Sequence, residues 1–298
     1  MTALDIVRGP DDITRNVIAV MQQTTDPRLR EIMVSFITHL HGFVRDVRLT
    51  EDEFRTATAL INRIGQASNA KHNEAVLMAG SLGVSALVRL LNNGNEGQTE
   101  TSQSLLGPFW RMNSPVTENG GTILRSPTPG EPLHVTGRVL DHEGRPVAGA
   151  EVDVWHASPA GLYENQDESQ VDHNLRGKLT TDVEGRFDFW TVRMVGYPIP
   201  TDGVVGELLA AQKRHPFRPA HLHALIVKPG FKVLISQVYD PSDPNIGSDV
   251  QFAVTEALTG EFVRHDEPFG DVPAPWHSLD YVYKMEPGDT VLPRAPIE

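Results

Sequence analysis

Two tyrosines and two histidines in the second half of the chain are the side chains best suited to chemistry. Tyr163 follows Gly-Leu, Tyr197 stands in a Gly-Tyr-Pro-Ile-Pro segment, and His221 and His223 end an Arg-Pro-Ala-His-Leu-His segment. A phenolate is a hard, anionic oxygen donor, which suits a highly charged ion such as Fe(III) better than Zn(II) or Cu(I). Two phenolates and two imidazoles would hold iron in the ferric state, and this donor set predicts oxygenation of a catechol-like ring.

Each of these residues has a simpler interpretation when it is taken alone. His221 and His223 lie in a predicted strand, where side chains two residues apart point to the same face. That spacing would let both imidazoles reach one ion, but it also occurs by chance on an exposed strand face. A loop tyrosine such as Tyr163 or Tyr197 usually packs half-buried against its neighbours. Only the joint pattern favours a metal site.

Charged residues near these side chains could also contribute to a metal site, either as a nearby cation or as alternative ligands. Arg218 has prolines on both sides, which restrict the backbone and would help to hold its cation over a site. The alternative is a surface arginine that pairs with a carboxylate. Asp153, Asp167 and Asp172 are alternative ligands in place of a tyrosine, although we expect these three carboxylates to be solvated.

The first hundred residues show apolar side chains at steps of three and four, which predicts helices. The expected helices span residues 11–21, 27–44, 50–64 and 73–91. Thr50 and Glu53 have the spacing of a capping box at the start of the third helix. Residues 92–103 contain almost no apolar side chain, so we expect a linker there.

From residue 105 onward, proline and glycine become frequent and β-branched runs alternate with polar residues. Short strands are expected over residues 133–140, 151–156, 186–192, 222–227 and 233–239. Many short strands with turns between them are typical of an antiparallel sandwich. We therefore predict an α+β protein, with a helical N-terminal domain over residues 1–104 and an antiparallel β-sandwich domain over 105–298.

The composition excludes several kinds of site and partner. Lys and Arg number 26 against 39 Asp and Glu, and this net charge of −13 argues against a nucleic acid or an anionic membrane as partner. The 298 residues include no cysteine, which excludes disulfides, iron–sulfur clusters and thiolate sites. The N-terminus lacks the apolar run of a signal peptide, and no membrane-spanning run is present. We expect a cytoplasmic protein.

The segments around the four candidate ligands resemble the iron site of the intradiol ring-cleavage dioxygenase family. The resemblance is carried by Gly-Leu-Tyr at 161–163, Tyr-Pro-Ile-Pro at 197–200 and Arg-Pro-Ala-His-Leu-His at 218–223, in that order. The hairpin unit over 137–156 and Leu-Gly-Pro-Phe at 106–109 are also similar. The likeness extends into the helical N-terminal part, so it implies a helical dimerisation domain followed by a catalytic β-sandwich.

Carried over to this sequence, the resemblance implies a role for each residue. One Fe(III) per subunit would be bound by Tyr163, Tyr197, His221 and His223. Tyr197 would also leave the metal and take a substrate proton. Arg218 would stabilise negative charge on the reacting ring, and Gln237 would support a ligand without touching the metal. The substrate pocket would be lined by Leu77, Gly80, Gly107, Pro108, Phe109, Ile199, Pro200, Arg218 and Val250.

The N-terminal run over residues 26–54 looks most like the hydroxyquinol branch of the family, which uses O2 to open benzene-1,2,4-triol to maleylacetate. One departure concerns Gly80, which stands where that branch is expected to have an acidic residue. The glycine removes an acceptor for the third hydroxyl group of the triol. Cleavage of catechol or chlorocatechol to cis,cis-muconates is therefore the alternative.

The resemblance also implies partners: an aromatic diol or triol, O2, a second copy of the chain bound through the N-terminal helices, and a phospholipid at that interface. Two other classes of protein stay open from the residues. A transthyretin-like binding module over residues 133–195 would need no catalysis, but it leaves Tyr197, Arg218, His221 and His223 unexplained. A zinc hydrolase would use His221, His223 and a carboxylate, and would leave both tyrosines without a role.

Overall fold

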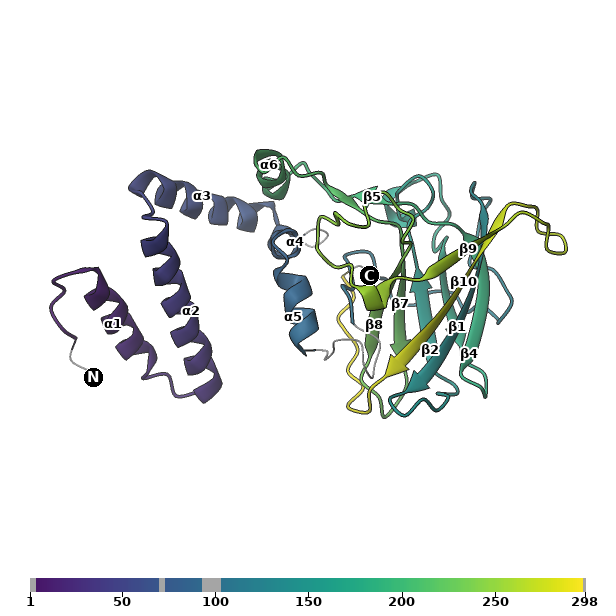
Figure 1. Ribbon diagram of the computed structural model, residues 1–298, viewed down its shortest axis with the longest axis horizontal. Coiled ribbons are helices and arrows are strands. Elements are labelled where there is room, and N and C mark those ends of the chain that lie inside the picture. Colours follow the sequence, from purple (N-terminus) through teal and green to yellow (C-terminus); the bar gives the residue numbers. More distant parts are fainter. Residues whose placement is uncertain (1–3, 70–72, 93–102, 297–298) are drawn as a thin grey trace. The chain divides into compact units, whose positions relative to one another are not determined.

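The computed structural model describes residues 4–69, 73–92 and 103–296 (Figure 1). The chain forms two compact units, Met1–Arg63 and Ile64–Glu298. The predicted linker over residues 92–103 falls almost wholly outside the described residues. The border between the predicted helical and sandwich domains therefore stays a prediction.

Local hydrogen bonds explain where the first three helices begin. These helices are α1 (Pro10–Met21), α2 (Pro27–Asp46) and α3 (Glu51–Ala67). The side chain of Asp26 accepts from two backbone N–H groups at the start of α2, and Thr50 and Glu53 form the predicted capping box of α3. At α1 the N-cap residue is Gly9, whose N–H donates to Asp12 at 3.1 Å. All three predicted helices are confirmed, with small differences at their ends.

The prediction of one helix over residues 73–91 is wrong, because the chain forms two helices there. They are α4 (Glu74–Ser81) and α5 (Val84–Asn92), with a bend of 77° between them. Gly83 lies at the break with φ +74°, a left-handed conformation that suits glycine and ends helices. Within the described residues, no single helix has the length and apolar character of a membrane span, and this bent pair reaches them only when both helices are counted together.

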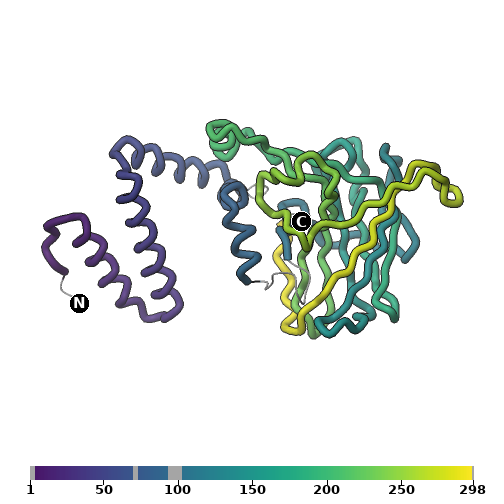
Figure 2. Tube along the Cα trace, in the orientation of Figure 1, coloured from purple at the N-terminus to yellow at the C-terminus, as the bar shows by residue number. Residues whose placement is uncertain are grey.

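Two four-stranded sheets form the body of the second unit (Figures 1 and 2). The first sheet has the order β4-β1-β10-β9 and the second has the order β3-β2-β7-β8. The strands are β1 (Pro132–Asp141), β2 (Glu151–Trp155), β3 (Arg176–Thr180), β4 (Arg186–Val192), β7 (His221–Val227), β8 (Leu234–Tyr239), β9 (Glu261–His265) and β10 (Trp276–Met285). A two-stranded sheet joins β5 (Tyr197–Pro198) to β6 (Phe217–Arg218). The remaining short helices are α6 (Val204–Ala211), η1 (Glu164–Gln166) and η2 (Glu256–Leu258).

The five predicted strands correspond to β1, β2, β4, β7 and β8, and the β-sandwich of the predicted α+β fold is confirmed. The strands β3, β9 and β10 were not predicted. In the first sheet β1 pairs with β10 in parallel, so this one pair departs from the expected antiparallel arrangement. Local sequence patterns do not reveal that pairing, because β10 lies far along the chain from β1 and the two meet only in the folded protein.

The apolar core lies between the two sheets. The second sheet therefore has an inner face in this core and an outer face directed away from the first sheet. Along β7, Leu222, Ala224 and Ile226 belong to this core, so His221 and His223 point to the outer face. That face is buried as well. A second apolar cluster covers it, with residues from the segment before β1, the loop after β2, and β5.

Candidate metal centre

Four donor atoms meet in a closed ring on the outer face of β7. Tyr163 Oη lies 3.0 Å from Tyr197 Oη, which lies 3.3 Å from His221 Nε2. His221 Nε2 is 3.1 Å from His223 Nε2, which is 3.1 Å from Tyr163 Oη. The four side chains are between 1% and 7% exposed. Four buried donor atoms at these separations can bind one shared cation.

The two tyrosines come from segments outside the two four-stranded sheets. Tyr197 begins β5, whose pairing with β6 places it opposite Arg218. Tyr163 immediately precedes η1, after the loop that follows β2. Gly161 in that loop has φ +77°, and a Cβ there would lie 3.3 Å from the Cβ of Tyr197. Glycine therefore permits both the backbone conformation and the close approach of the two tyrosine segments.

The two histidine rings are oriented by contacts behind them. His221 Nδ1 lies 2.7 Å from the carbonyl oxygen of Pro219, so Nδ1–H donates there and Nε2 keeps the lone pair that a metal needs. His223 stacks on Trp155 of β2 with ring centroids 4.6 Å apart. Gln237, opposite His223 in β8, has its Nε2 atom 3.2 Å from His223 Nδ1. Both imidazoles therefore present Nε2 to the tyrosines.

Burial shifts the pKa of each of the four groups in the direction that favours the neutral form: upward for the tyrosines and downward for the histidines. Burial, reinforced by Tyr197, raises the pKa of the Tyr163 phenol well above its usual value. Burial also raises the pKa of Tyr197, although the Arg218 cation opposes that shift. Burial and the Arg218 cation lower the pKa of His221 to about 3, and burial with His221 lowers the pKa of His223. The imidazoles are therefore neutral donors, and the buried phenols would ionise only beside a strong cation.

This donor set fits a ferric ion, because two phenolates supply the hard anionic oxygens that Fe(III) prefers. The zinc-hydrolase alternative lacks its third ligand, because the described residues contain no group of three or more His, Cys, Asp or Glu side chains placed to hold a metal. The carboxylates considered as replacements for tyrosine are engaged elsewhere. Asp172 pairs with Arg111 at 2.5 Å, and Asp167 accepts from Ser169.

The expectation that Asp153 is solvated is wrong. This residue on β2 is 2% exposed, and its Oδ2 atom accepts from the indole N–H of Trp110 at 3.0 Å. Burial raises the pKa of Asp153. The strand pattern placed Asp153 in β2, but the cover over the outer face that buries it comes from a segment before β1, which the strand itself does not reveal.

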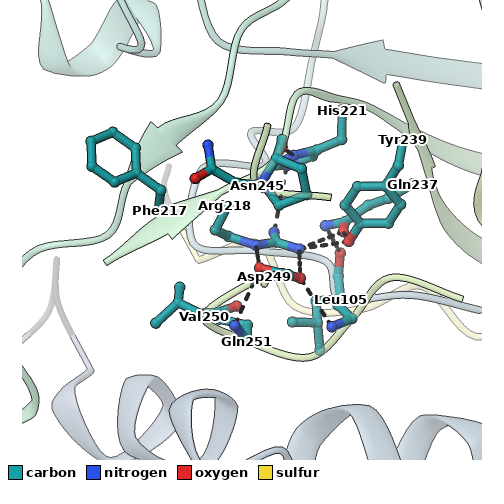
Figure 3. Close-up of polar contacts among 12 residues, drawn as sticks. Leu105, Phe217, Arg218, His221, Gln237, Tyr239, Asn245, Asp249, Val250 and Gln251 are labelled. Atoms are coloured by element: carbon teal, nitrogen blue, oxygen red, sulfur yellow. Dashed lines mark hydrogen bonds and ion pairs between the residues drawn. The ribbon is translucent and has the colours of Figure 1, made fainter. Parts of the chain in front are cut away.

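Arg218 on β6 is 3% exposed, which excludes the surface-arginine alternative. Figure 3 shows its guanidinium beside His221. Its Nη1 atom lies 3.5 Å from His221 Nε2. Its Nη2 atom donates to Tyr239 Oη at 2.6 Å and to Gln237 Oε1 at 3.0 Å. On the other side, Nε and Nη2 donate to the two oxygens of Asp249 at 3.2 and 3.3 Å. The guanidinium is therefore a fixed cation beside the four donors.

Sequence reasoning missed Tyr239 and Asp249. Tyr239 follows Gln237 by two residues in β8, so strand alternation places it on the same face and could have identified it. Asp249 lies in a loop between β8 and η2, where no local pattern marks it. The Tyr239 hydroxyl also donates to Gln237 Oε1, so Gln237 links Arg218, Tyr239 and His223.

Five of the residues predicted to line the substrate pocket form two groups: three lie in one apolar cluster, and two contact the proposed metal ligands. Ile199 and Val250 are buried in one apolar cluster, against which Leu77 packs. Phe109 stacks on Tyr163 with ring centroids 4.4 Å apart. Gly107 has φ +75°, and a Cβ there would lie 3.3 Å from His223 Cε1.

Gly80, Pro108 and Pro200, which were also predicted to line the pocket, belong to neither group of contacts. Gly80 on α4 is buried, and a Cβ there would lie 3.1 Å from Cδ of Gln251, next to Val250. Pro108 and Pro200 are exposed. The roles of all these residues in substrate binding stay predictions.

Comparison with known proteins agrees with this site. The family described as "Dioxygenase" matches residues 105–286, and the family described as "Catechol dioxygenase N terminus" matches residues 26–100. A hydroxyquinol 1,2-dioxygenase of Rhizobium sp. is 42% identical over 84% of this chain and 85% of the relative. A catechol 1,2-dioxygenase of Candida albicans is 37% identical over 90% of this chain and 89% of the relative.

Solved structures show the same similarity. The crystal structure of hydroxyquinol 1,2-dioxygenase from Pseudomonas putida DLL-E4 has a TM-score of 0.87 and 36% identity, and the match covers 94% of this chain and 99% of that one. The matched regions extend far beyond residues 133–195, so the transthyretin-like alternative is too small to account for the chain. On its sequence and its fold, the chain belongs to the intradiol ring-cleavage dioxygenase family.

Proposed function

We propose that the chain is an Fe(III)-dependent intradiol dioxygenase that binds one iron per subunit through Tyr163, Tyr197, His221 and His223. The convergence of these four donor atoms is the observation that carries the proposal. A bound ferric ion supplies electron withdrawal from a chelated catecholate, which makes a ring carbon reactive toward O2. The C–C bond between the two hydroxylated carbons is the bond that breaks.

Tyr197 takes a proton from the substrate in this proposal. It is 7% exposed against 1% for Tyr163, and it stands at the edge of a two-residue strand beside the exposed Pro198. Tyr163 is stacked on Phe109 and has less room to move. These differences support Tyr197 as the phenol that would leave the metal and accept the substrate proton.

Arg218 stabilises the negative charge that develops on the ring during O2 attack. A buried guanidinium fixed in place needs no reorganisation at the moment of reaction, and in a dry site its electrostatic effect is larger than in water. The apolar side chains of Ile199 and Val250, with Phe109 over Tyr163, exclude water from the same space.

Hydroxyquinol is the substrate we propose, with maleylacetate as product. The similarity to the hydroxyquinol 1,2-dioxygenase of Rhizobium sp. supports this choice. Catechol or a chlorocatechol is the second candidate, because Gly80 offers no acceptor for a third hydroxyl group and a catechol 1,2-dioxygenase is also similar. Steady-state rates on hydroxyquinol, catechol, 4-chlorocatechol and protocatechuate, with identification of each product, decide between them.

Metal analysis and visible spectroscopy of the purified protein test the iron proposal. We expect about one iron per chain and a broad visible band from phenolate-to-iron charge transfer, which Tyr163→Phe should weaken or abolish. Asp141→Asn, a change of the carboxylate at the end of β1, is a control and should keep the band. A folded, colourless, iron-free protein from iron-replete cells would contradict the proposal.

We also propose that two copies associate through the N-terminal helices, with a phospholipid at the interface. Apolar side chains along α2 support this, because Ile32, Phe36 and Phe43 are each about half exposed, and contiguous exposed apolar surface is typical of an interface. Sedimentation of the full chain, with lipid extraction from the purified protein, tests both points. The cytoplasmic location stays a prediction.

A further inference from the structure

Arg218 is a buried cation on a long, flexible side chain, so its orientation requires fixed partners. Its Nη1 atom points toward His221, while Nη2 donates to the neutral groups of Gln237 and Tyr239. The charged partner is Asp249, which receives Nε and Nη2 through its two oxygens. Figure 3 shows the guanidinium between Asp249 and the pair formed by Gln237 and Tyr239.

Asp249 is itself fixed to the backbone of its own loop. Oδ1 accepts from the N–H of Gln251 at 3.2 Å, and Oδ2 accepts from the N–H of Ala253 at 3.0 Å. The residue is 5% exposed. A two-point ion pair defines both the position and the plane of a guanidinium, which a single neutral acceptor does not. The anchored carboxylate is therefore the charged, two-point contact among the groups that fix the direction in which Nη1 points.

We propose that Asp249 is the positioning residue of Arg218: it holds the guanidinium so that Nη1 faces the metal ligands and the reacting ring. This inference rests on the proposed function, because it gives Arg218 a charge to stabilise. Asp249 makes no hydrogen bond to any of the four ligands and positions Arg218 through direct contact, while its charge also acts on Tyr197 and His221 over a longer distance.

A cavity that Asp249 helps to line offers a direct way to test its charge. This cavity of about 500 Å³ opens to the surface and is lined by Asp249 together with the basic side chains of Lys213, Arg214 and His215. If Asp249 is shortened to alanine, a small carboxylate can enter from the cavity and occupy the vacated place beside Arg218. The basic lining favours entry of such an anion.

The experiment compares Asp249→Asn, Asp249→Ala and Asp249→Glu with the wild-type holoenzyme. We expect kcat on the preferred catechol to fall about 10–100-fold in the asparagine and alanine variants, as happens when a partner that orients a site residue is lost. Iron content, the visible band and the spectral change on anaerobic substrate binding should stay as in the wild type, while the reaction with O2 slows. The glutamate variant should recover part of the rate.

Formate or acetate added to Asp249→Ala should restore part of kcat, whereas chloride at the same ionic strength should not. The same additions to the wild type measure any inhibition at the metal. Asp141→Asn is the matched control, because Asp141 also accepts from two backbone N–H groups and from an arginine Nε, that of Arg145, in a turn at the end of β1. It should lower thermal stability and leave kcat unchanged.

Two results would overturn the positioning role: an Asp249→Asn enzyme as fast as the wild type, or an Asp249→Ala enzyme whose lost rate no carboxylate restores while Asp249→Glu is equally slow. A wild-type protein that binds no iron and cleaves no catechol would instead overturn the proposed function. The two failures are therefore distinguishable.

Discussion

The two faces of the β3-β2-β7-β8 sheet are both buried, but they are covered by different parts of the molecule. The inner face contributes Val152, Leu222 and Ile226 to the apolar core between the sheets. The outer face carries His223 of β7 and Gln237 of β8. Both side chains are buried, and the apolar cluster on this face comes partly from segments outside the sheet. On β7, therefore, one side faces the apolar core and the other faces the proposed metal site, so substitutions of neighbouring residues should have different effects.

The largest expected effect is on the outer face. His223→Ala removes one of the four donors, and we expect loss of iron and of nearly all activity. Loss of a mere partner of a metal ligand already costs about 10–100-fold in metal affinity or activity, so loss of the ligand should cost more. Iron content and O2 uptake measure the effect. An iron-replete, active His223→Ala protein would break the assignment of the outer face to metal binding.

Arg218→Ala should separate charge stabilisation from metal binding on the same face. We expect the visible band and the iron to remain, while kcat falls about 10²–10³-fold, the typical cost of removing one donor that stabilises developing negative charge. Stopped-flow mixing of the anaerobic substrate complex with O2 is the measurement. A rate equal to that of the wild type would remove Arg218 from the chemistry.

Leu222→Ala tests the inner face one residue away from both histidines. Leu222 has no exposed surface, so the deletion should lower the free energy of unfolding by about 2–5 kcal/mol. Iron per folded chain should stay near the wild-type value, because the side chain points away from the site. Denaturant unfolding and metal analysis check both parts. Loss of iron with little loss of stability would mean that the two faces are not independent.

The smallest expected effect concerns substrate choice at Gly80. Gly80→Asp should favour hydroxyquinol over catechol by a few-fold, about 1 kcal/mol for a hydrogen bond to the third hydroxyl, provided that Gln251 moves aside, since the new Cβ would lie 3.1 Å from its Cδ. The double change with Gln251→Ala provides the space and should strengthen the preference. Relative kcat/KM values are the measurement, and unchanged ratios in both proteins would place Gly80 away from the ring.

The candidate ligands could be predicted because residue type and strand alternation are properties of short stretches of sequence. Donor chemistry identified the tyrosines and histidines, and strand alternation placed His221 and His223 on one face. The break at Gly83 was not foreseen, because glycine inside a helical pattern is often tolerated and its left-handed conformation is seen only in the folded chain. Nor was the parallel pairing of β1 with β10, which joins segments that are distant along the chain.

The amino-acid sequence was sufficient for the mixed helical and sandwich fold and for the hypothesis of a ferric site with four named ligands, because residue chemistry and periodicity are local properties. The ring of donor atoms about 3 Å apart, the anchoring of Arg218 by Asp249 and the contact between Gly80 and Gln251 came only from folding. Each of these joins helices, strands or loops that are separated in sequence, and packing in three dimensions, rather than any local pattern, sets the distances between them.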